Sequence, residues 1–250
     1  MTQTSSTPLI TVITVVYNGA KLLDKTIQSV ITQRYAPIEY IVIDGASTDG
    51  STDIIKKHEL KITKWLSEKD TGIYNAMNKG IKKATGKWIC FLNCGDVFTD
   101  NESVGKVAEA IALDNGGTTV IYGNILILQV DGTYKEKIAK EPCNLHRMFF
   151  CHQSAFVKTD VLRQFLFDER YKMSADLKFF KQCYYEKHLF KHLNYPLVIY
   201  DKSGISNTSR RKGLRENIAV VKEMDSGFEK ILFLLRLYFV IYWRNFLGKP

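Results

Sequence analysis

Three aspartates, far apart in the chain, could carry out chemistry together. Asp96 ends an apolar run within the stretch WICFLNCGDVF at residues 88–98. A carboxylate at the rigid end of a strand can hold Mg²⁺ or Mn²⁺ against a phosphate. Asp44 directly follows another apolar run and could accept a hydrogen bond from a nucleotide base or ribose. Asp176 could act as a general base toward a hydroxyl group.

Each of these aspartates also has a purely structural interpretation. Asp44 and Asp96 both lie beside a glycine, where carboxylates commonly form turns. Asp176 opens an expected helix, where a negative charge favours the helix dipole. The residue types alone therefore leave both interpretations open at each position.

The elements that must position these residues alternate through the first hundred residues. Apolar, β-branched runs predict buried strands at 9–16, 38–43, 62–66 and 88–92. Apolar residues at helical spacing predict helices between them, near 22–31, 52–58 and 73–84. This alternation is typical of a layered α/β sheet of parallel strands, in which ligands lie at the carboxyl ends of the strands. Tyr17-Asn18, Asp44-Gly45 and residues 93–96 fall at those ends.

The second half of the chain has a different pattern. Asp131-Gly132, between apolar runs at 121–130 and 134–138, predicts a β-hairpin. A helix is expected near 175–186, a strand near 197–200 and a flexible loop at 204–209. His152-Gln153 is a polar pair between aromatic residues, and a histidine in such surroundings is more often structural than catalytic.

The composition favours one large domain with room for a smaller appendage. Of 250 residues, 45% are hydrophobic and 24% are charged, so disorder is not expected. No signal peptide is visible, which together with an odd number of cysteines predicts a reducing cytosol and free thiols. The spacing of Cys143, His146, Cys151 and His152 fits no common zinc site.

The positive charge of the chain gathers near its C-terminus. The net charge is +9, and residues 202–250 hold ten Lys/Arg against four Asp/Glu. This favours anionic partners, but no zinc-finger or RNA-binding signature supports nucleic acid. Residues 228–247 are apolar and aromatic, yet Arg236 and Arg244 disfavour a membrane span and favour an amphipathic helix in the membrane interface. A helix packed on the core, or an oligomer interface, is the alternative.

Six segments in a fixed order carry a resemblance to a known family. They are ITVVYNGAKLLDKTIQSV, IEYIVIDGASTDGSTDII, EKDTGIYNAMNKGIKKATGKWICFLNCGD, VIYGN, CHQSAFV and YKMSADLKFF. Together they span about residues 9–205 and resemble family 2 glycosyltransferases of GT-A fold. More narrowly, they resemble the short bacterial enzymes that build capsular, exopolysaccharide or O-antigen repeat units.

The resemblance implies an α/β fold with a Rossmann-like mixed sheet flanked by helices, of the spore-coat polysaccharide synthesis type. The glycosyltransferase domain would cover residues 1–205, with a nucleotide-binding half at about 9–100 and an acceptor-binding half at about 118–205. Residues 206–250 would form a basic, aromatic C-terminal helical segment.

The resemblance also implies a reaction and its residues. A sugar would move, with inversion, from a nucleotide-sugar, expected to be UDP-linked, to a hydroxyl of a lipid-linked saccharide. Asp176 would be the catalytic base, and Asp96 would bind Mn²⁺ or Mg²⁺. The family's metal motif usually has two or three aspartates, whereas Asn93 and Gly95 stand at the earlier positions here.

The other expected binding residues surround the donor. Arg210 and Arg211 are included for their charge and position, because they could close on the diphosphate. His152 and Gln153 would lie near the donor sugar or the acceptor. The remaining residues expected to contact the nucleotide-sugar are Thr14, Val16, Tyr17, Asn18, Asp44, Ser47, Asp49, Gly72, Tyr74, Asn78, Asn93 and Gly95.

These expectations place the protein in the cytoplasm, attached peripherally to the inner face of the cell membrane through its tail. A homo-oligomer is compatible with the same sequence features. Two rival functions stay open. A sugar-phosphate nucleotidyltransferase usually has a glycine-rich phosphate loop near its N-terminus, which VVYNGAKLLD lacks. A non-catalytic nucleotide-sugar binder that acts as an assembly partner is favoured by the reduced metal motif.

Overall fold

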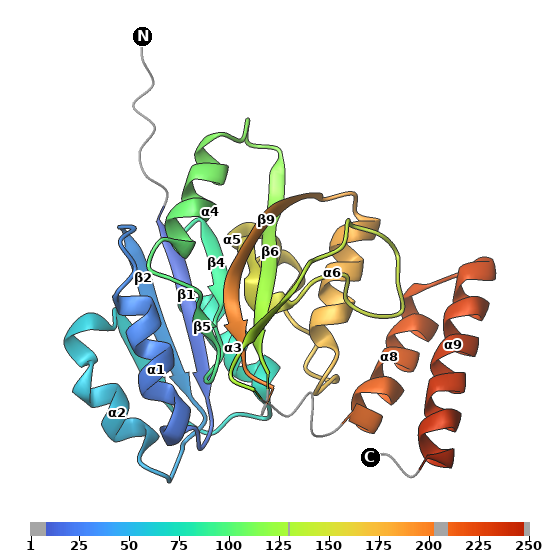
Figure 1. Cartoon of the computed structure of the whole chain (residues 1–250), viewed down its shortest axis with the longest axis horizontal. Coiled ribbons are helices and arrows are strands. Elements are labelled where there is room, and N and C mark those ends of the chain that lie inside the picture. The colour runs from blue at the N-terminus through green and yellow to red at the C-terminus, as the bar shows by residue number, and fades with distance from the viewer. Residues whose placement is uncertain (1–8, 130, 203–209, 248–250) are drawn as a thin grey trace.

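The computed structural model describes residues 9–129, 131–202 and 210–247. These residues form one nine-stranded sheet with helices on both faces, and a pair of helices stands beside it (Figure 1). The strand order is β3-β2-β1-β4-β8-β6-β9-β5, and β7 pairs with β6 outside this path. The expected fold class, a mixed sheet flanked by helices with a C-terminal helical tail, is confirmed.

The first four strands are parallel, as their apolar β-branched runs predict. In β1 (Ile10–Val16) every residue is buried, so the strand lies in the middle of the sheet. Val16 lies beside Asp44 in the register, which brings these two strand ends together. The other parallel strands are β2 (Ile38–Asp44), β3 (Lys64–Ser67) and β4 (Trp88–Phe91).

The second half of the sheet mixes directions. Both β4 and β6 are antiparallel to β8, whereas β9 is parallel to β6. The short β5 pairs antiparallel with β9, with Val97 beside Ile199. This pairing brings the turn at residues 93–96 next to the end of β9. The bounds are β5 (Val97–Phe98), β6 (Thr118–Leu128), β7 (Tyr134–Lys137), β8 (Ala155–Lys158) and β9 (Leu189–Tyr200).

The side chains of the strands alternate between the two faces of the sheet, and a hydrophobic core lies on each face. Ile13 and its neighbours on one face pack with α3 (Ile73–Lys83), α5 (Thr159–Phe165) and α6 (Ala175–Tyr185). Val12 and its neighbours on the other face pack with α1 (Ala20–Ile31), α2 (Ser51–Lys57) and α4 (Ser103–Ala112). Two 3₁₀ turns, η1 (Glu59–Lys61) and η2 (His152–Ser154), complete the list of elements in this part of the chain.

The C-terminal residues form a helical hairpin rather than one helix. In α8 (Arg210–Met224), Ile218 and Val221 pack against Phe233 and Leu237 of α9 (Gly227–Phe246). The helix α8 lies beside α6, and α9 is the outer helix (Figure 1). None of the helices in the described ranges is long and apolar enough to cross a membrane.

The main departures from the sequence prediction lie in the second half. The elements β5, α4, β8 and α5 were not predicted, and the strand expected at 197–200 begins at Leu189. The loop expected at 204–209 lies outside the described residues. The hairpin around Asp131-Gly132 joins β6 to β7 as predicted.

Candidate active site

A cavity of about 870 Å³ opens at the carboxyl ends of β1 and β4. Its volume falls within the usual range for pockets that bind small organic ligands. Both halves of the sheet contribute to its walls, from the turn after β1 to the beginning of α6 and the end of β9. The position agrees with the expectation that ligands bind where parallel strands end.

Asp176 lies in this cavity with a histidine and a tyrosine bonded to it. Nδ1 of His152 lies 3.1 Å from Oδ2 of Asp176, and the Tyr74 hydroxyl donates to Oδ1 at 2.8 Å. These side chains come from η2, α3 and the first turn of α6, so three elements far apart in the chain build the cluster. Because each carboxylate oxygen has its own partner, the orientation of the Asp176 carboxylate is fixed.

The surroundings of Asp176 keep it ionised. Burial alone would raise the pKa of Asp176, but the hydrogen bond and charge of His152, with the Tyr74 hydroxyl, lower the pKa below its usual value. Burial and the Asp176 charge raise the pKa of Tyr74 well above its usual value, so Tyr74 remains a hydrogen-bond donor. A buried, ionised and oriented carboxylate can accept a proton from a hydroxyl group.

Asp96 forms a second acidic centre in the same cavity. It is 3% exposed, and its Oδ1 accepts the backbone N–H of Asp201 at 2.8 Å. Burial, with a smaller effect of the negative charge of Asp201, raises the pKa of Asp96 to about 7, although the Asp201 N–H and the charge of His152 act in the opposite direction. A bound divalent cation would reverse this effect, because it favours the ionised carboxylate.

Asp201 provides the carboxylate that the sequence lacks at position 95. Gly95 has a φ of +104°, and a Cβ atom there would lie 2.6 Å from Oδ2 of Asp201. The Asp201 carboxylate thus fills the space where a side chain at position 95 would begin. Sequence reasoning missed Asp201, although it directly follows the strand expected at 197–200 and the same strand-end rule would have found it.

The residues near Asp96 fit a magnesium or manganese ion. Asp96 and Asp201 supply carboxylates, and Oδ1 of Asn93 is buried with no hydrogen-bond partner. These are the hard oxygen donors that Mg²⁺ and Mn²⁺ prefer, with substrate phosphates completing the shell. No group of three or more His, Cys, Asp or Glu suited to a metal occurs among the described residues. A metal here would therefore depend on oxygen atoms of the ligand.

The turn after β1 forms the wall of the cavity nearest to β2. Asn18, with a φ of +49°, accepts the Thr48 N–H at 2.9 Å through Oδ1, and its own N–H donates to Ser47 Oγ at 2.8 Å. Oδ2 of Asp49 accepts the Ala20 N–H at 2.9 Å. Ser47 and Asp49 therefore tie the turns after β1 and β2 together but do not line the cavity.

Asp44 lies behind this wall and is fully buried. Its Oδ2 accepts the Ser67 hydroxyl at 2.6 Å and the Ser47 N–H at 3.0 Å, whereas its Oδ1 has no hydrogen-bond partner. Gly45 allows Asp70 to approach, because a Cβ at position 45 would lie 2.5 Å from Oδ2 of Asp70. Asp70 lines the cavity, whereas Asp44 does not.

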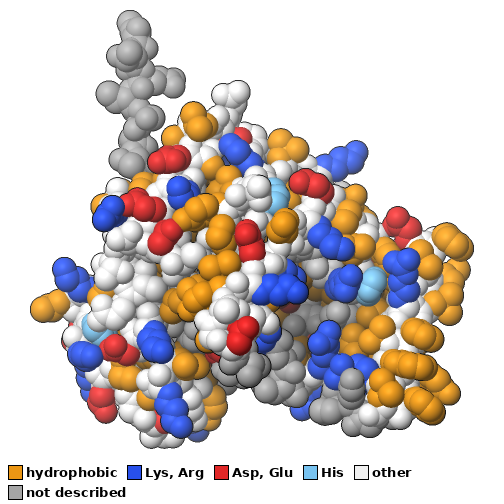
Figure 2. All heavy atoms as spheres, viewed as in Figure 1, with side chains coloured by type: hydrophobic (Ala, Val, Ile, Leu, Met, Phe, Trp, Pro, Cys, Tyr) orange, Lys and Arg blue, Asp and Glu red, His pale blue; other side chains and the backbone are white. Residues whose placement is uncertain are grey.

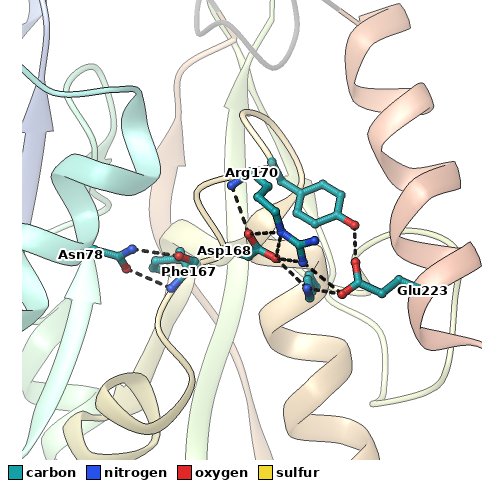
Figure 3. Close-up of polar contacts among 7 residues, drawn as sticks. Asn78, Phe167, Asp168, Arg170 and Glu223 are labelled. Carbon is teal, nitrogen blue, oxygen red and sulfur yellow. Dashed lines mark hydrogen bonds and ion pairs between the residues drawn. The ribbon is translucent and has the colours of Figure 1, made fainter.

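Asn78 does not line the cavity and instead connects α3 to the backbone of Phe167. Its amide donates to the Phe167 carbonyl at 2.8 Å, and its Oδ1 accepts the Phe167 N–H at 2.9 Å (Figure 3). Thr14 is likewise buried and donates to the Leu92 carbonyl at 2.9 Å. Both residues hold elements that line the cavity.

The expected site residues thus divide into two groups. Those that line the cavity are Val16, Tyr17, Asn18, Gly72, Tyr74, Asn93, Asp96, His152, Gln153, Asp176 and Arg210. Those that do not are Thr14, Asp44, Ser47, Asp49, Asn78, Gly95 and Arg211. Asp70, which opens the segment 70–78 that the family resemblance implies would cover the nucleotide-sugar, also lines the cavity, and sequence reasoning did not select the charged lining residues Lys137, Lys172, Asp201 and Lys202.

Comparison with known sequences gives consistent matches. The model of the family "Glycosyl transferase family 2" matches residues 11–169. A "PGL/p-HBAD biosynthesis glycosyltransferase" of Mycobacterium tuberculosis is 25% identical over 260 residues, covering 95% of this chain and 98% of the relative. An uncharacterized glycosyltransferase of the same species is 39% identical over 109 residues, covering 43% of this chain and 42% of the relative.

Solved structures share the fold. TarS 1–349 of S. aureus in complex with UDP-GlcNAc matches with a TM-score of 0.68 and 17% identity, over 92% of this chain and 71% of that one. The mannosyltransferase PcManGT of Pyrobaculum calidifontis, in complex with GDP-Man and Mn²⁺, matches with a TM-score of 0.67 and 16% identity, over 94% and 70%. At this level of identity, the likeness shows the GT-A fold alone.

Proposed function

Since this chain belongs to glycosyltransferase family 2 and is a glycosyltransferase of GT-A fold, we propose that it moves a sugar, with inversion, from a nucleoside diphosphate sugar to a saccharide hydroxyl. One observation carries the proposal: the Asp176–His152 pair and the Asp96–Asp201 pair line one cavity. A base for the acceptor and an acidic centre for the diphosphate are the two parts that such a reaction needs.

In the proposed reaction, the acceptor hydroxyl gives its proton to the base centred on Asp176 while its oxygen bonds to the anomeric carbon. The bond from that carbon to the diphosphate oxygen breaks, and the electron pair leaves with the nucleotide. His152 and Tyr74 keep the Asp176 carboxylate ionised and oriented. Attack opposite to the leaving group inverts the anomeric centre.

Cations would bind the diphosphate of the donor. Asp96 and Asp201, with Asn93 beside them, are the residues that would hold Mn²⁺ or Mg²⁺, and the Mn²⁺ bound to the mannosyltransferase PcManGT supports this choice. A bound divalent cation neutralises the negative charge that develops on the departing diphosphate. Lys172, Lys202 and Arg210 add positive charge to the walls.

A uridine nucleotide is the proposed carrier, and the UDP-GlcNAc bound to TarS supports it. The proposed acceptor is a lipid-linked saccharide used in building a surface polysaccharide.

The outer face of α9 supports attachment to an anionic membrane. Large apolar side chains remain exposed along its length: Phe228, Ile231, Leu235, Tyr238, Phe239, Tyr242, Trp243 and Phe246. Figure 2 shows hydrophobic side chains gathered on the side of the molecule where this helix lies. Residues 210–247 also hold eight Lys/Arg against four Asp/Glu, which suits an anionic lipid surface better than a second copy of the same basic hairpin. These features support the proposal that the protein binds the inner face of the cell membrane.

Vesicle flotation tests the membrane proposal. The protein should float with vesicles that contain phosphatidylglycerol and much less with pure phosphatidylcholine vesicles, and the double variant L235D/F239D should lose the binding. A dimer in gel filtration that this variant dissociates, without any vesicle binding, would assign the face to a second copy instead.

Ligand-induced stabilisation tests the proposed function. The purified protein is heated with UDP-glucose, UDP-N-acetylglucosamine, UDP-galactose or GDP-mannose, with and without Mn²⁺, and donor hydrolysis is followed in parallel. We expect one donor to raise the melting temperature and to be cleaved slowly to the nucleoside diphosphate. Stabilisation without any cleavage or transfer would favour the non-catalytic alternative, and pyrophosphate release from a nucleoside triphosphate would favour the nucleotidyltransferase.

A further inference from the structure

Glu216 of α8 makes contacts that the proposed mechanism does not use. Its Oε1 accepts the backbone N–H of Lys172 at 3.0 Å, and its Oε2 accepts those of Met173 at 2.8 Å and Ser174 at 3.0 Å. These hydrogen bonds to an ionised acceptor are charge-assisted and hence stronger than neutral ones. One side chain, 42 to 44 positions further along the chain, thus fixes the path of three consecutive residues.

The segment 172–174 leads directly into the helix that carries the base. Ser174 is the N-cap of α6, and Asp176 is the second residue of that helix. An N-cap serine usually bonds to the N–H groups of its own helix, but Ser174 makes no such bond. Its hydroxyl donates instead to Oδ1 of Asn217 at 2.7 Å. The entry into α6 is therefore held by α8.

The same segment also reaches the opposite wall of the cavity. Lys172 and Met173 line the cavity, and Nζ of Lys172 donates to the Thr71 carbonyl at 2.8 Å. Thr71 precedes Gly72, which is another lining residue. A shift of the segment would move the base and loosen this wall together.

Two other acidic residues of the helical hairpin, Glu223 and Asp225, make contacts of a different kind. Glu223 accepts the Tyr171 hydroxyl and the Lys178 ammonium group, both at 2.6 Å, and Arg170 at 3.2 Å (Figure 3). Asp225 accepts Lys181 at 2.9 Å in a buried ion pair. These contacts join side chains, with Arg170 and Tyr171 just before α6 and Lys178 and Lys181 within it, whereas Glu216 bonds to the backbone of residues 172–174.

We infer that Glu216 is a positioning residue that holds the Asp176 carboxylate at its working place between His152 and Tyr74. The inference rests on the proposed function, because it takes Asp176 to be the base. A displacement of about 1 Å at a reacting group can lower a rate by about 10²-fold. The helical hairpin is then a support of the catalytic centre as well as a surface feature.

The experiment compares Glu216→Gln with Glu223→Gln, which makes the same change two turns further along the same helix. Glutamine at 216 replaces one acceptor oxygen by an NH₂ group that must face backbone N–H groups. Hydrolysis of UDP-glucose, UDP-N-acetylglucosamine and GDP-mannose with water as acceptor gives kcat and KM. Hydrogen exchange, followed by mass spectrometry, reports on the amides of residues 172–174 without any ligand.

We expect Glu216→Gln to lower kcat by about 10-fold or more with little change in the KM of the donor, and to speed exchange at residues 172–174. Glu223→Gln should lower the melting temperature by a similar amount but keep kcat within about twofold. A wild-type kcat in folded Glu216→Gln, or an equal loss of kcat in both variants, would overturn the positioning role. A wild-type protein that cleaves and transfers nothing would instead overturn the proposed function, so the two failures are distinguishable.

Discussion

Replacing Asp96 by asparagine should stabilise the metal-free protein at high pH. Asp96 is 3% exposed, and burial raises its pKa from 3.8 to about 7. Between these two pH values the folded protein binds one proton more than the unfolded chain, so the free energy of unfolding falls as pH rises from about 4 to about 7. Above that window the protein contains a buried charge. A pKa difference of about three units corresponds to about 4 kcal/mol.

The size of the effect should follow pH. Asparagine has a similar shape and its carbonyl oxygen can still accept the Asp201 N–H, which Asp96 accepts at 2.8 Å. The variant should therefore exceed the wild type in unfolding free energy by about 2 kcal/mol at pH 5 and about 4 kcal/mol at pH 8. Urea denaturation in EDTA measures both values, and Mn²⁺ with UDP should stabilise the wild type alone. A difference that does not change with pH, or a variant that is less stable at pH 8, would refute the reasoning.

Two further substitutions test the neighbours of these carboxylates. His152→Gln removes the side chain whose hydrogen bond and charge most lower the pKa of Asp176, so this pKa should rise even though the Tyr74 hydrogen bond remains. The acid limb of the kcat/KM profile should then move to higher pH, because the base must be ionised; an unmoved limb in a pH–rate profile would disprove this link. Asp201→Asn should weaken Mn²⁺ binding in the presence of UDP by about tenfold, measured by titration calorimetry. The exposed control Asp131→Asn should not, and equal affinities in both variants would remove Asp201 from the metal site.

The first half of the fold could be predicted because its signals are local. Continuous β-branched runs, such as residues 10–16, occur where a strand is buried on both faces. The strand-end rule then found Asn93 and Asp96, which line the cavity. Asp44 follows the same rule, yet its side chain bonds to Ser67 and the Ser47 N–H and does not line the cavity, because the rule locates a strand end and not the direction of a side chain.

The residues that sequence reasoning missed owe their positions to distant pairing. The end of the strand expected at 197–200 could have drawn attention to Asp201, but its place beside Asp96 depends on the pairing of β5 with the end of β9, about a hundred residues further on, which no local pattern indicates. Glu216 reaches the entry of α6 only through the packing of α8 against it. Local signals therefore selected Asp176 and Asp96, which line the cavity, whereas Asp201 and Glu216 required the tertiary structure.

The most direct test of the central claim is the Asp176→Asn variant. Asparagine keeps the shape of the side chain but cannot accept the acceptor's proton. Turnover of the nucleotide-sugar that stabilises the wild type should fall by about 10² to 10⁴-fold, while the same donor still raises the melting temperature of the variant. Wild-type turnover in this variant would contradict the claim that Asp176 is the base of the reaction.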